Sequence, residues 1–140
     1  MEKITLEKFQ ELYIDEFEKI IDVFELNNIR YSLAFGTLLG AIRENDIIKW
    51  DYDIDIFVED HQADKIINTF RKLNYKVKTF KNGESSFGLS RIYLNDLYRQ
   101  RFDEETPNYA FIDIFHYRIV DNNIEQITRL KKRLSKFAYY

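Results

Sequence analysis

The residues best suited to chemistry are three aspartates that alternate with apolar residues. In the run D-Y-D-I-D-I-F-V, Asp51, Asp53 and Asp55 stand two positions apart. Alternate side chains of a strand point to one face, so the carboxylates would share a face and Ile54 and Ile56 would be buried on the other. Like charges at this spacing disfavour one another's ionised forms. A divalent cation would remove that repulsion, and Mg²⁺ prefers carboxylate oxygens together with substrate phosphate oxygens. The spacing therefore indicates a metal site beside a phosphate site.

The acidic run could also serve a purely structural purpose or bind a different ligand. A charged strand edge that prevents aggregation is the simplest alternative. A calcium-binding loop needs glycine at its sixth position and glutamate at its twelfth, but counting from Asp51 these positions hold Ile56 and Gln62. A Walker phosphate loop is also excluded, because Gly36 and Gly40 are not followed by Lys-Ser or Lys-Thr.

A further carboxylate interrupts an apolar stretch later in the chain. Asp113 lies in the middle of Y-A-F-I-D-I-F, which predicts a strand over residues 109–115. A buried carboxylate is costly unless it is paired or ligates a metal. Metal ions in a two-metal site must also be held from more than one side. We therefore expect Asp113 to join Asp53 and Asp55 at the metal site; the alternative is an ion pair with a neighbouring Arg or Lys.

The segment before these carboxylates predicts a helix that covers one face of the sheet. Apolar residues recur every three or four positions from Leu6 to Phe24, the pattern of an amphipathic helix. Thr5 can cap its start, and the helix is expected to end near Asn27. Its acidic residues are expected to form a solvated face: Glu11, Asp15, Glu16 and Glu18.

Shorter elements complete the expected layout. Strands are predicted over residues 31–35, 75–80 and 87–94, the last carrying Arg91, with Asn82-Gly83 as the turn between the last two. A turn at Gly36-Thr37 and a helical turn over 38–42 precede the acidic run. A second helix begins at Asp60, and its apolar positions are Ala63, Ile66, Ile67, Phe70 and Leu73. A polar connection that contains Arg99, Arg101 and Pro107 leads to the strand at 109–115.

The run G-T-L-L-G-A-I-R from Gly36, followed by W-D from Trp50 and by D-I-D-I, resembles the LicD family. The usual form of that family is G-T-L-L-G-A-[VI]-R-H-x-G-F-I-P-W-D-D-D-I-D-I, and the chain fits this frame without a gap. The resemblance covers residues 5–116 and includes I-D-I-F around Asp113. It implies an α/β (α+β) fold of the nucleotidyltransferase type, a small mixed sheet flanked by helices. It also implies transfer of a phospho-substituent, such as phosphocholine, from a cytidine-diphosphate-linked donor to a sugar hydroxyl.

The resemblance also implies roles for particular residues. Asp53, Asp55 and Asp113 would be the catalytic carboxylates and would hold one or two Mg²⁺ or Mn²⁺ ions. Substrate binding would fall to four residues: Gly36, Thr37, Arg43 and Asp51. The backbone at a glycine can approach a phosphate closely, and the threonine hydroxyl can donate to it. The arginine would steady donor charge or pair with Asp51, and the aspartate would orient that arginine or a metal-bound water. Trp50 is expected in the core.

The chain departs from the family form at several positions. Tyr52, Glu44, Asp46, Lys49 and His116 replace the usual Asp, His, Gly, Pro and Pro. Asp53, Asp55 and Asp113 are all present despite these changes. The changes therefore leave open only the identity of the donor and of the acceptor. Three hypotheses follow: a LicD-like phosphotransferase, a nucleotidyltransferase that moves a nucleoside monophosphate onto a small molecule, and a non-catalytic module that binds a nucleotide or a partner. Release of CMP, release of pyrophosphate and absence of turnover distinguish them.

Composition narrows the remaining possibilities. The chain has 140 residues, 45% of them hydrophobic, which predicts one domain over residues 1–140, minimal for the family or shortened at its C-terminus. A net charge of −3 does not favour nucleic-acid binding. The sequence has no cysteine, so no disulfide framework or thiolate metal site is available. No apolar run of the length of a membrane span and no signal core is present, so a cytoplasmic protein is expected. Five cations lie on an expected helix at 127–137, either a solvated face or a contact for the donor diphosphate or an anionic acceptor: Arg129, Lys131, Lys132, Arg133 and Lys136.

Overall fold

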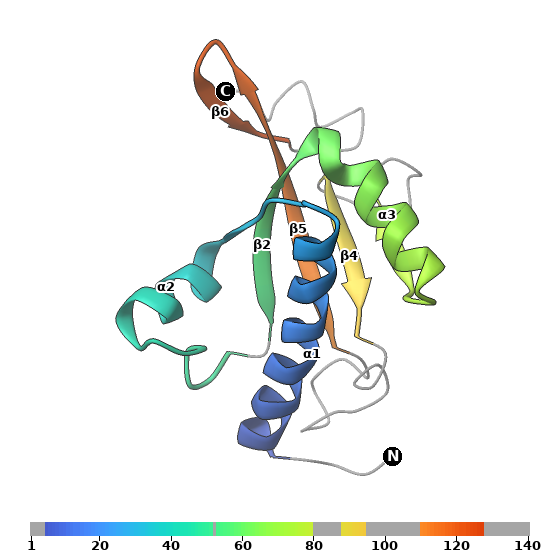
Figure 1. Cartoon of the computed structure of the whole chain (residues 1–140). Coiled ribbons are helices and arrows are strands. Elements are labelled where there is room, and N and C mark those ends of the chain that lie inside the picture. The colour runs from blue at the N-terminus through green and yellow to red at the C-terminus, as the bar shows by residue number, and fades with distance from the viewer. Residues whose placement is uncertain (1–4, 52, 80–87, 95–109, 128–140) are drawn as a thin grey trace, which may run out of the picture.

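The strands of the protein form one mixed sheet, seen in a computed structural model that describes residues 5–51, 53–79, 88–94 and 110–127 (Figure 1). The strand order is β1-β2-β5-β4-β3, with β6 paired to the outer part of β5. The β2–β5 pair is parallel, and the other pairs are antiparallel. The expected small mixed sheet is thereby confirmed. The strands are β1 Ser32–Leu33, β2 Ile54–Glu59, β3 Val77–Thr79, β4 Leu89–Tyr93, β5 Phe111–Val120 and β6 Asn123–Gln126.

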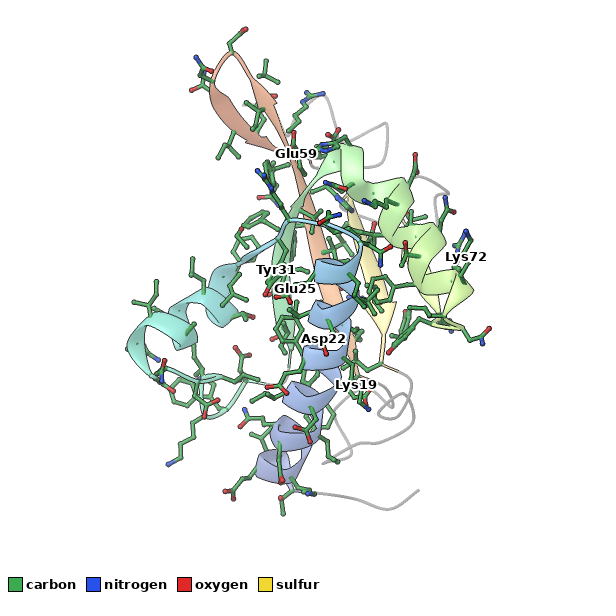
Figure 2. The ribbon with its side chains drawn as sticks, in the orientation of Figure 1. Lys19, Asp22, Glu25, Tyr31, Glu59 and Lys72 are labelled. Atoms are coloured by element: carbon green, nitrogen blue, oxygen red, sulfur yellow. The ribbon has the colours of Figure 1, made fainter. Side chains whose placement is uncertain are left out.

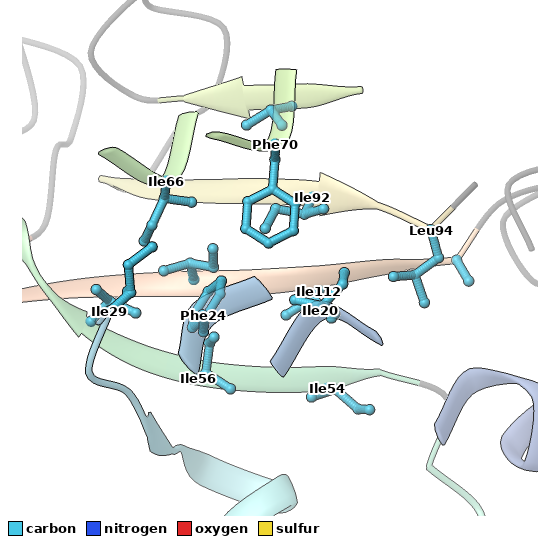
Figure 3. Close-up of a cluster of buried hydrophobic side chains, with 14 of the residues drawn as sticks. Ile20, Phe24, Ile29, Ile54, Ile56, Ile66, Phe70, Ile92, Leu94 and Ile112 are labelled. Carbon is cyan, nitrogen blue, oxygen red and sulfur yellow. The ribbon is translucent and has the colours of Figure 1, made fainter. Parts of the chain in front are cut away.

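Two helices, α1 (Leu6–Leu26) and α3 (Ala63–Lys72), cover the same face of this sheet (Figure 1). Because strand side chains alternate between faces, the even-numbered residues of β2 and β5 point toward these helices. Figure 3 shows the core that results, in which side chains of the helices interdigitate with those of the strands: Ile20, Phe24, Ile66 and Phe70 with Ile54, Ile56, Ile92 and Ile112. The odd-numbered residues of β2 and β5, among them Asp55 and Asp113, therefore lie on the opposite face.

The first helix agrees with the sequence expectation at both ends. The Thr5 hydroxyl accepts a hydrogen bond from the backbone N–H of Lys8 at 3.1 Å, and Asn28 leaves the helix with a left-handed φ of 54°. The expectation that Glu16 is solvated is wrong: its side chain is buried and pairs with Lys19, which neutralises a charge that the core would otherwise exclude. Charged residues along α1 that are exposed are labelled in Figure 2: Lys19, Asp22 and Glu25.

The segment before the acidic run is more helical than expected. Helix α2 spans Phe35–Arg43, so Gly36 and Thr37 lie in its first turn instead of in a turn before it, and β1 has only two residues. The helix begins with a left-handed backbone at Phe35, φ 48°. This unusual conformation for a bulky residue sets its ring against Phe57 and Phe115, with ring centroids 5.3 and 4.8 Å away. A sequence period cannot reveal such a start.

The acidic run also differs from the expected strand. Strand β2 begins at Ile54, so Asp51 and Asp53 precede it and only Asp55 lies within it. A 3₁₀ turn, η1 (Asp60–Gln62), stands before α3, and Leu73 after that helix is 48% exposed instead of packed in the core. Some expectations lie outside the described residues: the Asn82-Gly83 turn, the connection with Arg99, Arg101 and Pro107, and the basic helix near residue 131.

The hairpin of β5 and β6 was not expected from the sequence. Strand β5 continues past Phe115 to Val120 and turns back through Asp121 and Asn122, whose φ values are 49° and 64°. Two successive left-handed residues form the type of two-residue turn that matches strand twist, and Asp and Asn tolerate it well. Among the helices in the described part of the chain, none is both long and apolar enough to span a membrane.

Candidate active site

Two of the expected catalytic carboxylates lie side by side on neighbouring parallel strands. In the β2–β5 register, Asp55 is paired with Asp113. Opposed residues of neighbouring strands point to the same face, and such strands lie about 4.8 Å apart. Asp53 stands immediately before β2, two residues from Asp55, and Asp51 precedes it by two more. The fold therefore brings together carboxylates that are about sixty positions apart in the chain.

The protein environment disfavours ionisation of two of these groups. Burial is the largest cause that raises the pKa of Asp53, to about 6, and a hydrogen bond and charge from Asp51 add to it. Burial also raises the pKa of Asp55 to about 7, followed by the charges of Asp53, Asp113 and Asp51, while Arg91 opposes the shift. Perturbed carboxylates that converge on one face are typical of functional sites.

Arg91, on β4, holds Asp113 through two hydrogen bonds. Its Nε donates to Oδ1 at 2.6 Å and its Nη2 donates to Oδ2 at 2.9 Å. The guanidinium also lies over the Phe111 ring, 3.6 Å from the centroid. The ion pair that was the alternative for Asp113 is thus present. Sequence reasoning placed Arg91 on this strand without giving it a role, because its pairing depends on the β4–β5 register.

A buried tyrosine of α1 joins the two strands that carry the carboxylates. The Tyr13 hydroxyl accepts a hydrogen bond from the backbone N–H of Ile54 at 3.0 Å and donates one to the carbonyl of Phe111. Burial raises the pKa of this hydroxyl well above its usual value, and the nearby aspartate charges add to the effect, so it stays protonated. The sequence pattern identified Tyr13 only as an apolar helix position. Its effect is to fix the relative position of β2 and β5 at the level of Asp55 and Asp113.

Gly36 and Thr37 lie against the acidic residues. The Thr37 hydroxyl oxygen accepts a hydrogen bond from the backbone N–H of Asp55 at 2.9 Å, which leaves the hydroxyl hydrogen for donation. A Cβ atom at Gly36 would lie 3.0 Å from Asp51 Oδ2. Both residues thus border the site where the sequence placed them, and their contact with a substrate stays a prediction.

Arg43 and Trp50 do not have the expected surroundings. Arg43 pairs with Glu44 at 2.9 Å instead of with Asp51, and its side chain is 50% exposed. Trp50 is 70% exposed, so the expectation of a core position is wrong. The loop that carries Trp50 and Asp51 is held by Gln10 of α1, whose amide donates to the carbonyl oxygens of Ile48 at 3.0 Å and Asp51 at 2.5 Å. Gln10 gave no signal in the sequence.

The chemistry of these side chains fits a divalent cation such as Mg²⁺. Asp53 and Asp55 offer hard oxygen ligands whose charges are disfavoured without a cation, and each Asp113 oxygen keeps a second lone pair beside its bond to Arg91. Within the described ranges, no three His, Cys, Asp or Glu side chains are gathered closely enough to hold a metal ion. Mg²⁺ commonly uses one or two carboxylates and takes its remaining ligands from water and substrate phosphates. Two aspartates therefore suffice as the protein's share.

A family model and a curated protein both match most of the chain. Residues 28–139 match the model described as "LicD/FKTN/FKRP, nucleotidyltransferase domain". The chain is 28% identical over 137 residues to the lipopolysaccharide cholinephosphotransferase LicD of Haemophilus influenzae. The matched segment covers 95% of the chain and 52% of that protein. The chain thus spans about half the length of this curated relative.

Two further proteins share similarity over a shorter segment or at lower identity. A segment of 43 residues is 51% identical to the human ribitol 5-phosphate transferase FKRP. This segment makes up 29% of the chain and 9% of that protein. The crystal structure of the lincosamide antibiotic adenylyltransferase LnuA, bound to lincomycin, superposes with a TM-score of 0.46 at 22% identity. It covers 83% of this chain and 68% of that one.

Proposed function

The chain belongs to the LicD family of nucleotidyltransferase domains, and on that premise we propose that it transfers a phospho-substituent to a sugar hydroxyl of a glycan. The donor is a nucleotide-diphosphate-linked compound, with a cytidine diphosphate link favoured, and Mg²⁺ or Mn²⁺ is the cofactor. The names of two relatives support this class of reaction, since one is a cholinephosphotransferase and another a ribitol 5-phosphate transferase.

The observation that carries the proposal is the pairing of Asp55 with Asp113 across two parallel strands, with Asp53 directly before the first of these strands. Carboxylates are otherwise costly in such numbers on a partly buried surface. When bound, one or two divalent ions would neutralise the developing charge and lower the pKa of the attacking hydroxyl. Asp53 and Asp55 would hold the ion, and Asp113 would be a further ligand once a bound ion draws the carboxylates closer together. Phosphoryl transfer depends mainly on such positioning and charge neutralisation.

The remaining residues would bind and orient the donor. The Gly36 backbone and the Thr37 hydroxyl would approach its phosphates, and the half-exposed Arg43 would steady their charge. The acceptor hydroxyl oxygen forms the new bond to phosphorus, the bond from phosphorus to the leaving nucleotide oxygen breaks, and the nucleoside monophosphate leaves with that electron pair. The hydroxyl proton passes to a carboxylate or to solvent. Tyr13 and Arg91 act indirectly, because they set the positions of the carboxylates.

The test is a screen of nucleotide-diphosphate-linked donors, CDP-choline among them, with Mg²⁺ or Mn²⁺ and a panel of sugars. Mass spectrometry would identify the nucleotide released. Release of CMP with a modified sugar supports the proposal. Release of pyrophosphate from a nucleoside triphosphate would indicate the nucleotidyltransferase alternative, and metal binding without turnover would indicate a binding module.

Conservative variants of the carboxylates complete the experiment. Asp53→Asn, Asp55→Asn and Asp113→Asn each remove one charge at nearly constant volume. Each variant should lose about 3–4 kcal/mol of transition-state stabilisation, which lowers the transfer rate by roughly 100- to 1000-fold. Asp22→Asn, on the exposed side of α1, is the matched control and should keep the wild-type rate. A carboxylate whose variant keeps that rate under saturating metal is not a ligand.

A further inference from the structure

We propose that the acceptor is anionic and binds over β4 and β3, where Arg91, Lys78 and Lys76 form a cationic surface beside the carboxylates. This inference rests on the proposed function and names the class of its second substrate: a saccharide that carries a phosphate or carboxylate group. We call these three residues the cationic surface below.

The sheet register places the cationic surface on the same face as the catalytic carboxylates. Asp55 is opposite Asp113, Asp113 is opposite Arg91, and Arg91 is opposite Lys78. Lys76, two residues before Lys78, lies on the same face, next to Tyr93. One row across four strands therefore changes from negative at β2 and β5 to positive at β4 and β3. Neither α1 nor α3 covers this face.

Aromatic rings hold these cations in place. The Lys76 and Lys78 ammonium groups lie 5.0 and 5.9 Å from the centroid of the Tyr93 ring, which is buried. The Arg91 guanidinium lies over Phe111, the neighbour of Tyr93 in the β4–β5 register. Contacts between cations and ring faces restrict the long side chains and lower the entropy lost when they bind an anion. The surface is therefore partly ordered before any ligand arrives.

The charge balance of the row shows which part of it can attract an anion. The Arg91 guanidinium uses two of its N–H groups on Asp113, and this pair is close to neutral. The two lysines add positive charge beyond that pair. Lys78 is half-buried and Lys76 is exposed beside it, so the positive charge of Lys78 is accessible to an anion on this face.

The geometry of phosphoryl transfer assigns this surface to the acceptor. The attacking and leaving oxygens lie roughly in line on opposite sides of the phosphorus. The proposed donor residues, Gly36, Thr37 and Arg43, all belong to α2, which contacts β2. If the phosphorus lies at Asp55 and Asp113, the attacking hydroxyl approaches from the other side, over β5 and β4. The rest of the acceptor saccharide, beyond that hydroxyl, then lies over the cationic surface.

The spacing of the strands sets the scale of the acceptor. Neighbouring strands lie about 4.8 Å apart, so Lys78 on β3 is roughly 10 Å from Asp113 on β5. This distance corresponds to one or two sugar rings between the reacting hydroxyl and the anionic group. The hydroxyl oxygens of a neutral sugar carry no charge when they accept hydrogen bonds from the lysines. A phosphate or carboxylate group is negatively charged, so its hydrogen bonds with the lysines are stronger.

Binding without donor or metal provides the test. Isotope-labelled protein in chelator would be titrated with galactose 6-phosphate, galactose and inorganic phosphate, and the NMR shifts followed. We expect galactose 6-phosphate to bind roughly tenfold more tightly than galactose, the equivalent of one hydrogen bond to a charged group. Lys76→Gln/Lys78→Gln should remove that advantage. Lys65→Gln, the same change on the exposed side of α3, should alter the dissociation constants less than twofold, since it lies on the helix-covered side of the sheet.

Three outcomes of this titration would overturn the inference. Galactose that binds as tightly as its phosphate would show that charge plays no part. Inorganic phosphate that binds as tightly as galactose 6-phosphate would show an adventitious ion only. A double variant that binds like Lys65→Gln would place the anion elsewhere. Because no donor is present, these results stand apart from the screen for transfer: transfer to neutral sugars alone would contradict the anionic acceptor and leave the proposed function intact.

Discussion

Asp53 and Asp55 carry their negative charges at a cost in the folded chain, and this predicts how stability changes with pH. Their pKa values are raised from 3.8 in the ordinary carboxyl to about 6 and about 7, chiefly by burial. The folded state therefore holds protons that the unfolded state has released between about pH 4 and pH 7. The stability that protonation contributes is fully present below about pH 4 and is lost as the pH rises through these two values.

The expected result is a thermal midpoint, measured in chelator, that falls as the pH rises from 5 to 8. Asp55→Asn should flatten this dependence because the neutral amide does not titrate. Asp22→Asn, on the exposed side of α1, serves as the control and should keep the wild-type slope. Equal slopes for wild type and Asp55→Asn would contradict the raised pKa of Asp55.

Two glycines of α2 should respond differently to the same substitution. A Cβ atom at Gly36 would meet only the end of the Asp51 side chain at 3.0 Å, whereas at Gly40 it would lie 2.6 Å from the backbone oxygen of Asp46. Side-chain ends move readily and backbone does not. Gly36→Ala should therefore change unfolding free energy by less than about 1 kcal/mol, while Gly40→Ala should cost about 1–3 kcal/mol from overpacking.

Denaturant unfolding of both glycine variants provides the measurement, and each variant is the control for the other. In the transfer assay, Gly36→Ala should weaken donor use more than its stability change explains, because it displaces Asp51 and narrows the approach to the phosphates. Wild-type donor use by Gly36→Ala and by the bulkier Gly36→Val would show that this turn of α2 does not face the donor.

Among the elements, helix α1 is connected to the strands of the site by Tyr13. Tyr13→Phe removes the hydroxyl and leaves the Ile54 N–H and the Phe111 carbonyl without this partner. A buried backbone group that loses its partner costs about 1–3 kcal/mol, so unfolding free energy should fall by that amount. Because the hydroxyl bridges β2 and β5, the transfer rate should fall too.

Urea unfolding and the transfer assay, run on the same variants, measure both effects. Tyr31→Phe is the matched control: it removes the hydroxyl of a tyrosine that is partly buried and keeps the ring contact with Phe24. It should leave both quantities near wild type. Equal behaviour of the two variants would mean that the Tyr13 hydroxyl does not hold the strands.

For the molecule as a whole, metal binding should stabilise the fold. A cation that binds only the folded state adds about 2.7 kcal/mol at a hundredfold excess over its dissociation constant. For a chain of this size the thermal midpoint should rise by several degrees, on a general scale of roughly 2–8 °C per kcal/mol. Asp53→Asn should stabilise the metal-free protein, because it relieves repulsion, and should remove the metal-dependent rise.

Thermal melts of wild type and Asp53→Asn, each in chelator and in millimolar Mg²⁺ or Mn²⁺, test both effects of the same cause. A variant that responds to metal as strongly as wild type would exclude Asp53 as a ligand. If wild type shows no response, repeating the melt with cytidine diphosphate decides whether the site needs the nucleotide to form.

Features that depend on residues close together in the chain could be predicted from the amino-acid sequence. Side-chain alternation identified the two faces of β2, the helical period and Thr5 cap predicted α1, and an apolar frame marked Asp113 as exceptional. The long motif from Gly36 to Ile56 identified the family, which the matched family model confirms. Each signal comes from residues that are neighbours in the chain, so the periods of 2 and 3.6 suffice to read it.

Contacts between distant residues required the folded chain. Arg91 reaches Asp113 because β4 pairs with β5 in one register, and Lys78 joins the row because β3 pairs with β4. Tyr13 and Gln10 act on strands and loops more than thirty residues away. A register shift of one residue would turn every strand side chain to the other face, and no local pattern chooses between registers. That choice comes from packing α1 and α3 on the sheet, which buries one face and leaves the other to the carboxylates and their cationic neighbours.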